Sequence, residues 1–187
     1  MKLTTRQVVT SGILTALTIA MGATGIGFIP VPTPAGAATL MHLPVILAGI
    51  LEGPVIGALT GLIFGLFTLQ FLPDPFVVLP ARLLIGVVAF LVYRATRRTA
   101  WGTALAAAAG SATNTVGTLG LFTLLGYAPI SGKGGVIAIA VTHGIPEAIV
   151  AAIVIMPVVM AVTKVRAGSN VAAELRNECE GYSSRRS

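Results

Sequence analysis

Charged residues are scarce in this chain. Asp, Glu, Lys and Arg together make up 10% of its 187 residues, whereas 55% are hydrophobic and the mean hydropathy is +0.93. Because a soluble domain carries about 25% charged residues, this composition excludes soluble globular and disordered proteins. Cys179 is the single cysteine, which excludes an intramolecular disulfide and a multi-cysteine metal site. Aromatic residues, at 6%, are few for stacking on flat ligands.

Long apolar runs fill most of the sequence. They cover residues 8–28, 38–51, 55–72, 76–93, 101–125 and 136–162, and a membrane-spanning helix needs about 20 apolar residues. The second run is short and favours a buried or tilted helix. The pattern predicts an all-α polytopic membrane protein: a six-helix bundle over residues 1–163, followed by a polar cytoplasmic tail over 164–187. Alternating prolines in residues 28–36 predict an extended loop.

Basic residues flank these runs. Ten of the twelve lie at the amino end, in residues 94–98 and in the tail, which predicts that both termini and the 94–98 loop face the cytosol. They form no single basic face, so no nucleic-acid partner is expected. A cleaved signal peptide ending at residues 35–37 is the competing interpretation of the first run. That run exceeds the usual apolar core of about 7–15 residues, and cleavage would leave an odd number of helices.

Small residues recur every four positions in two of the runs. Glycines at 53, 57, 61 and 65 share one helix face, which predicts close packing inside the bundle. Gly12, Ala16 and Ala20 have the same spacing in the first run. For them, internal packing and contact with another protein remain equally open.

A few polar side chains lie within the apolar runs. They are His42, Arg82, Asn114, His143 and Glu147. Such groups are costly in lipid and usually face a cavity or a partner. From a rise of 1.5 Å per residue, all five fall between the outer ends of the helices and the membrane midplane, at depths of about 6–17 Å. We expect a pocket that opens outward, with a snorkelling arginine, a buried structural acid and structural histidines as the alternatives.

The sequence contains no convincing set of catalytic residues. Ser111 and His143 are typical of intramembrane serine proteases, but no glycine follows Ser111. Phosphotransfer needs several acids to hold a metal, and Glu147 is the sole acid within the runs. Residues 126–133 lack the spacing of a phosphate-binding loop. We therefore expect no enzyme, metal or cofactor, and any ATP hydrolysis belongs to another subunit.

Four stretches together resemble a known family. Residues 41–66, 80–94, 113–126 and 144–157 are similar to the substrate-binding S components of energy-coupling factor (ECF) transporters. The resemblance implies a multi-pass cell-membrane protein that binds a vitamin or related micronutrient with high affinity from outside. It also implies partners, namely a transmembrane T component and two cytosolic ATPases.

The resemblance also implies roles for particular residues. Gly12, Ala16 and Ala20 match the motif that docks onto the T component, and the proline-rich loop would gate the site. Arg82, Asn114 and Glu147 would lie in or beside the substrate pocket.

We extend the expected substrate site to His143 and His42. The His-Leu-Pro-Val run at 42–45 and the Thr-Asn-Thr segment at 113–115 look most like the branch that includes pantothenate and hydroxymethylpyrimidine carriers. The carboxylate of pantothenate would suit Arg82, whereas a thiamine-like cation would favour Glu147. The alternative function is a stand-alone proton-coupled carrier or channel that uses Glu147 and His143 as a relay.

Overall fold

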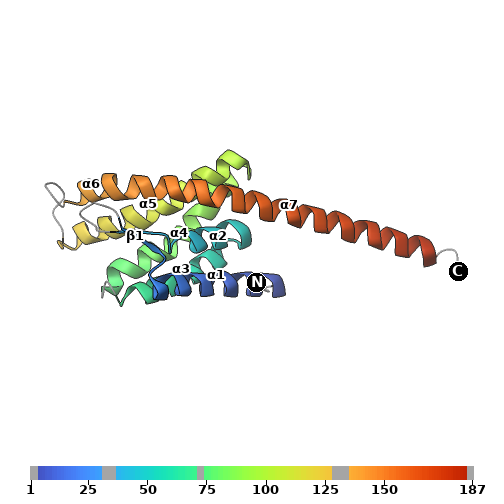
Figure 1. Ribbon diagram of the computed structural model, residues 1–187, viewed down its shortest axis with the longest axis horizontal. Coiled ribbons are helices and arrows are strands. Elements are labelled where there is room, and N and C mark those ends of the chain that lie inside the picture. Colours follow the sequence, from blue (N-terminus) through green and yellow to red (C-terminus); the bar gives the residue numbers. More distant parts are fainter. Residues whose placement is uncertain (1–3, 31–36, 71–73, 128–134, 185–187) are drawn as a thin grey trace.

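The computed structural model describes residues 4–30, 37–70, 74–127 and 135–184. Helices dominate this part of the chain, with one short antiparallel hairpin (Figure 1). The elements are α1 (Thr5–Thr24), β1 (Phe28–Pro30), β2 (Ala37–Thr39), α2 (Leu43–Glu52), α3 (Pro54–Thr68), α4 (Pro75–Ala95), α5 (Ala100–Leu124), α6 (Val136–Ile139), a π-helical turn η1 (Ala140–Gly144) and α7 (Ile145–Ser184). Most of the predicted proline-rich and glycine-rich loops, at 31–36 and 128–134, lies outside the described residues.

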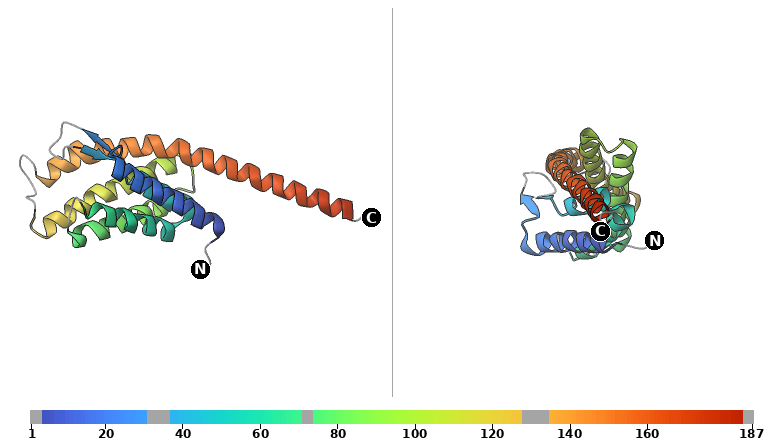
Figure 2. Two further views of the ribbon diagram at one scale, coloured as in Figure 1. Left: turned by 60° about the horizontal axis from the view of Figure 1, so that its bottom comes forward. Right: turned by 90° about the vertical axis from the view of Figure 1, so that its right-hand side faces the viewer.

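Helix α1 lies at the edge of the bundle (Figure 2). A capping box between Thr4 and Gln7 begins it, and Gly25 in the left-handed conformation ends it. It packs mainly against α2 and α3, and its buried residues are Leu14, Thr18 and Gly22. The opposite face is not covered by any other part of the chain that the structure describes.

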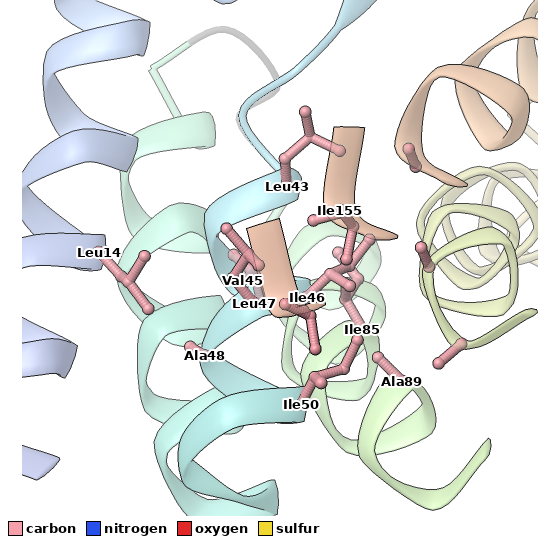
Figure 3. Close-up of a cluster of buried hydrophobic side chains, with 14 of the residues drawn as sticks. Leu14, Leu43, Val45, Ile46, Leu47, Ala48, Ile50, Ile85, Ala89 and Ile155 are labelled. Atoms are coloured by element: carbon pink, nitrogen blue, oxygen red, sulfur yellow. The ribbon is translucent and has the colours of Figure 1, made fainter. Parts of the chain in front are cut away.

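Helix α2 forms the centre of the bundle although it has only ten residues. Every residue from Leu43 to Ile50 is buried, and the helix contacts α1, α3, α4, α5 and α7. Figure 3 shows its side chains among Leu14, Ile85 and Ile155, which come from three other helices. The prediction that the apolar run from residue 38 is helical was wrong at its start. Residues 37–39 are instead paired with β1, and α2 begins with Leu43 and Pro44, where a proline removes no helical hydrogen bond.

Glycines bring α2, α3 and α4 into backbone contact. A Cβ atom placed at Gly57 would lie 2.8 Å from the Cα of Gly49 and 3.0 Å from the Cα of Gly86, too close for any side chain. Gly61 meets the backbone of Arg82 in the same way. Gly53 joins α2 to α3 with a positive φ of 106°. The predicted internal packing of the glycine face of α3 is therefore observed, and it fixes α4, which carries Arg82.

Helix α7 is much longer than the predicted sixth span. It continues without a break past residue 163 to Ser184, and its 40 residues correspond to about 60 Å. It projects from the bundle at its carboxyl end (Figure 1). Short π-helical and α-helical turns, η1 and α6, precede it, so the apolar run from residue 136 is one continuous column whose pitch changes at residues 140–144.

Three helical segments of the described chain are long and apolar enough to cross a membrane by length and composition. They are Thr5–Thr24, Pro75–Ala95 and Val136–Ser169, and the shorter apolar helices are α2 and α3. The amino end, the α4–α5 loop and the projecting end of α7 lie toward one end of the bundle, and the hairpin and α6 lie toward the other (Figure 1). We call these the terminal end and the hairpin end.

Candidate functional site

A polar cavity of about 140 Å³ lies between α4, α5 and α7, toward the hairpin end. Arg82, Asn114, His143 and Glu147 all line it, so four of the five predicted site residues come together although they are far apart in the sequence. Each of these four residues is more than nine-tenths buried, with 3–8% of its surface exposed. We call this the polar cavity.

Arg82 projects from α4 and is held by side chains of two other helices. Its Nη1 donates to Asn114 Oδ1 and, at 3.1 Å, to Thr118 Oγ1, both on α5. The guanidinium carbon lies 4.7 Å from the centre of the Phe64 ring of α3, a cation–π arrangement. Within the described chain, no carboxylate forms an ion pair with Arg82, and its Nε is buried without a hydrogen-bond partner. The cavity therefore has a buried cation whose charge is not matched by a direct partner.

Glu147, in contrast, has a hydrogen-bond donor on each of its two carboxylate oxygens. Oε1 accepts from the backbone N–H of Thr39 at 2.6 Å and from its hydroxyl at 3.3 Å. Oε2 accepts from Thr115 Oγ1 at 3.3 Å, and His143 Nε2 lies 3.2 Å from Oε1. The hairpin, α5 and α7 thus meet at this carboxylate. The two opposite charges of the cavity are separately bound rather than paired with each other.

His143 lies within the π-helical turn η1, four residues before Glu147, and the turn ends just before Pro146. Single π turns inside α-helices occur frequently at functional sites, and here η1 packs against α5 and carries His143 on the same side as Glu147. His143 Nδ1 is buried and makes no hydrogen bond within the described residues.

His42 is the predicted site residue that does not line the polar cavity. It immediately precedes α2 and is fully buried. The backbone of Thr39 is near its ring, but neither ring nitrogen meets hydrogen-bond geometry with a described residue. Ser111 Oγ of α5 is also buried and unpartnered in that part of the chain. His42 therefore belongs to the buried core of the bundle, behind the cavity wall.

Four residues that line the cavity or contact Arg82 were not among the predicted site residues: Thr39, Phe64, Thr115 and Thr118. Threonine and phenylalanine carry no charge, so they do not stand out in an apolar run. Thr118 had a detectable signal, because it lies four residues after Asn114 and therefore on the same helix face. Thr39 had none, since its contact with Glu147 depends on the hairpin and spans 108 residues of sequence.

The donor set suits an organic ligand better than a metal ion. In the described residues, no group of three or more His, Cys, Asp or Glu side chains could hold a metal. The polar cavity offers instead one guanidinium, one amide, three hydroxyls and a carboxylate with its histidine. Such a mixture can bind a small molecule that has both an anionic group and neutral hydrogen-bonding groups.

Helices long and apolar enough to cross a membrane, packed around a small cavity with buried polar groups, are typical of a multi-pass membrane protein with a candidate internal site. The sequence model of the family described as "ECF transporter, substrate-specific component" matches residues 6–159. The chain therefore belongs to this family, whose members are the substrate-binding components of transporters and not enzymes.

A curated relative gives a more specific comparison. The chain is 33% identical over 160 residues to the "Pantothenic acid transporter PanT" of Lactococcus lactis subsp. cremoris (strain MG1363). The match covers 70% of this chain and 80% of that protein. The resemblance to the ECF family that the sequence motifs carry is thus confirmed, together with membrane localisation and a role as the vitamin-specific subunit.

Proposed function

We propose that this S component binds pantothenate in the polar cavity, with its carboxylate on Arg82. The observation that carries the proposal is the buried guanidinium without a carboxylate partner. Glu147 of the same cavity is bound by Thr39, Thr115 and His143 instead, so an anionic ligand would supply the direct ion pair that the buried Arg82 lacks. The relative's name supports the same substrate, since pantothenic acid carries one carboxylate.

The remaining groups of the cavity suit the rest of that molecule. Pantothenate has two hydroxyls and an amide in addition to its carboxylate. Asn114 can both donate and accept hydrogen bonds, and Glu147 can accept from a hydroxyl. We assign Arg82, Asn114, Glu147 and His143 to direct contact with the ligand. His42 takes a supporting position behind them.

Entry of the ligand would require the hairpin to move. The cavity volume of about 140 Å³ is below the roughly 300 Å³ at which ligand pockets begin. Thr39 of β2 closes the cavity through its bonds to Glu147. Opening this contact would enlarge the cavity toward the hairpin end, in keeping with a gating role of the first loop.

In the membrane, we propose six helical passes over residues 1–163, with α2 and α3 as short passes supported by protein on most sides. The terminal end would face the cytosol, because ten of the twelve basic residues lie in its segments. Residues 164–187 would then be a cytoplasmic tail, in which residues up to Ser184 continue α7. The polar cavity would open to the outside.

Partners would complete the transporter. We propose that a T component docks on Gly12, Ala16 and Ala20, and that two ATPase subunits power release of the vitamin inward. All three residues are exposed on α1, and apart from the adjoining turns of α1 itself no atom of the described chain would come within 4 Å of a Cβ at Gly12. This face is therefore free to pack closely against another helix.

A panel titration tests the substrate. Purified chain in nanodiscs should bind pantothenate, measured by calorimetry, with a submicromolar dissociation constant and without any ATPase present. Thiamine and riboflavin should bind at least 100-fold more weakly, on the order expected when a buried polar site is left unmatched. Submicromolar binding of another vitamin, with none of pantothenate, would overturn the assignment.

The alternative function is a proton-coupled carrier, and the proximity of His143 to Glu147 at 3.2 Å is the observation in its favour. Proteoliposomes containing only this chain separate the two functions. An S component should show binding but no accumulation until the T component, the ATPases and ATP are supplied. Uptake by the chain alone, driven by a pH gradient and abolished in Glu147→Gln, would support the carrier instead.

A further inference from the structure

A second and larger cavity lies at the terminal end of the bundle, distant from the polar cavity. Its volume is about 570 Å³, and its walls come from the end of α2, the end of α4 and the middle of α7. Ile50, Phe90 and Tyr93 provide an apolar side, and Glu52, Arg98 and Arg166 provide a charged side. We call it the basic cavity. Nothing in the proposed vitamin site uses it.

The charges of the basic cavity do not cancel. Arg166 forms an ion pair with Glu52 and donates to the carbonyl of Leu51 at 3.0 Å, and the Glu52 side chain is only 1% exposed. Glu52 is therefore committed to Arg166. The side chain of Arg98 makes no hydrogen bond or ion pair with any residue that the structure describes. An adjoining cavity of about 200 Å³ shares Arg98 and adds Lys164, so the excess charge is positive.

The backbone holds Arg98 at this position in an unfavourable conformation. Arg97 and Arg98 have φ values of 56° and 59°, in the left-handed region that residues with a side chain rarely adopt. The other positive-φ residues of the described chain are all glycines. The Arg98 N–H donates to the carbonyl of Tyr93 at 3.1 Å, which fixes the turn. Strain of this kind, retained at Arg98 where glycine would relieve it, is a feature found at functional sites.

The surroundings of the basic cavity suit a lipid headgroup. Trp101, in the first turn of α5, is 82% exposed, and tryptophan is enriched at the membrane–water interface. The apolar wall offers contact for the glycerol and upper acyl region, and Arg98 and Lys164 offer contact for a phosphate. We propose that the basic cavity binds the anionic headgroup of a phospholipid from the cytoplasmic leaflet. This rests on the proposed orientation of the chain but not on the vitamin or its site.

Lipid retention tests the proposal. The full chain would be purified into nanodiscs of phosphatidylcholine containing a small fraction of phosphatidylglycerol, then released and analysed by native mass spectrometry. Arg98→Gly removes the guanidinium and also the backbone strain, so it should fold at least as well as the parent. We expect it to retain at least about tenfold less phosphatidylglycerol, the factor that corresponds to the loss of one specific hydrogen bond between charged groups. Arg98→Lys should retain most of the binding.

Arg94→Gln is the matched control, because Arg94 is exposed on α4 but lines neither cavity at the terminal end. It should leave retention unchanged. Unchanged retention in Arg98→Gly would overturn the proposal. So would equal competition by inorganic phosphate or glycerol phosphate, which would indicate a site for a free anion.

A protein partner is the other outcome that would contradict a lipid. In that case Arg98→Gly would lose assembly with the T component and ATPases while retaining phosphatidylglycerol. Vitamin affinity, measured on the same samples, should be the same in all variants. Lipid retention therefore tests the lipid proposal, and vitamin affinity separately tests the vitamin assignment, so the two failures are distinguishable.

Discussion

Replacing Arg82 by glutamine should remove the preference of the site for a carboxylate. The natural comparison ligand is pantothenol, in which a primary alcohol replaces the carboxylate of pantothenate. Hydrogen bonds to a charged group contribute about 1.5–3 kcal/mol, so the parent should favour pantothenate over pantothenol by about 10- to 150-fold. In Arg82→Gln, this ratio should fall close to one.

The ratio isolates the charge from structural damage. Arg82 also binds Asn114 and Thr118 and lies over Phe64, so its loss will disturb the cavity for both ligands. That disturbance largely cancels when the two affinities are compared in the same variant. Calorimetry on the four combinations of protein and ligand completes the cycle, with Arg94→Gln as a control that should keep the parent ratio. Equal weakening of both ligands in Arg82→Gln, with the preference intact, would refute the reasoning.

Three further predictions concern docking, packing and closure. Ala16→Trp should keep vitamin affinity but abolish copurification with the T component. The control Leu105→Trp, at a position 57% exposed on α5, should assemble normally. Loss of vitamin binding in Ala16→Trp would mean that this face of α1 supports the bundle. Gly57→Ala should lower the free energy of unfolding by about 1–3 kcal/mol through overpacking, seen as a lower Tm in detergent. Gly12→Ala should leave the Tm unchanged, because its Cβ meets no neighbouring helix within 4 Å. Equal Tm values for the two variants would contradict the close helix contact at Gly57. Thr39→Pro removes the N–H that lies 2.6 Å from Glu147 and should speed both association and dissociation of the vitamin in stopped-flow measurements, whereas Thr39→Val keeps that N–H and should change them little. Unaltered rates in Thr39→Pro would show that this contact does not close the site.

The sequence predicts a helix well where its apolar run begins directly after a residue that caps the first turn. Asp74 and Thr99 accept hydrogen bonds from the first turns of α4 and α5, and both helices begin within a residue of the predicted start. The spacing of glycines in α3 predicts its packing for the same reason, because a four-residue repeat maps directly onto one helix face.

Features that depend on tertiary contacts could not be predicted in this way. Residues 37–39 are apolar enough for a helix, yet pairing with β1 places them in a strand. The extension of α7 to Ser184 follows no apolar pattern, and the π turn at 140–144 has no local sequence signature. The candidate site was predictable to the extent that ionisable groups in lipid are rare. Its threonines were harder to recognise, since a hydroxyl is common in helices and usually bonds to its own backbone, as Thr118 also does to the carbonyl of Asn114 at 2.7 Å. The four-residue spacing from Asn114 was the signal that Thr118 offered.

The proposed binding of pantothenate through Arg82 is tested most directly by measuring whether the ligand carboxylate lies next to the Arg82 guanidinium. Pantothenate labelled with ¹³C at the carboxylate, bound to protein carrying ¹⁵N-labelled arginine side chains, reports this contact by dipolar dephasing in solid-state NMR. We expect strong dephasing at hydrogen-bond range, lost in Arg82→Lys even when the site is saturated with ligand. A saturated parent protein without dephasing, or dephasing that survives in Arg82→Lys, would place the carboxylate elsewhere and contradict the assignment of Arg82.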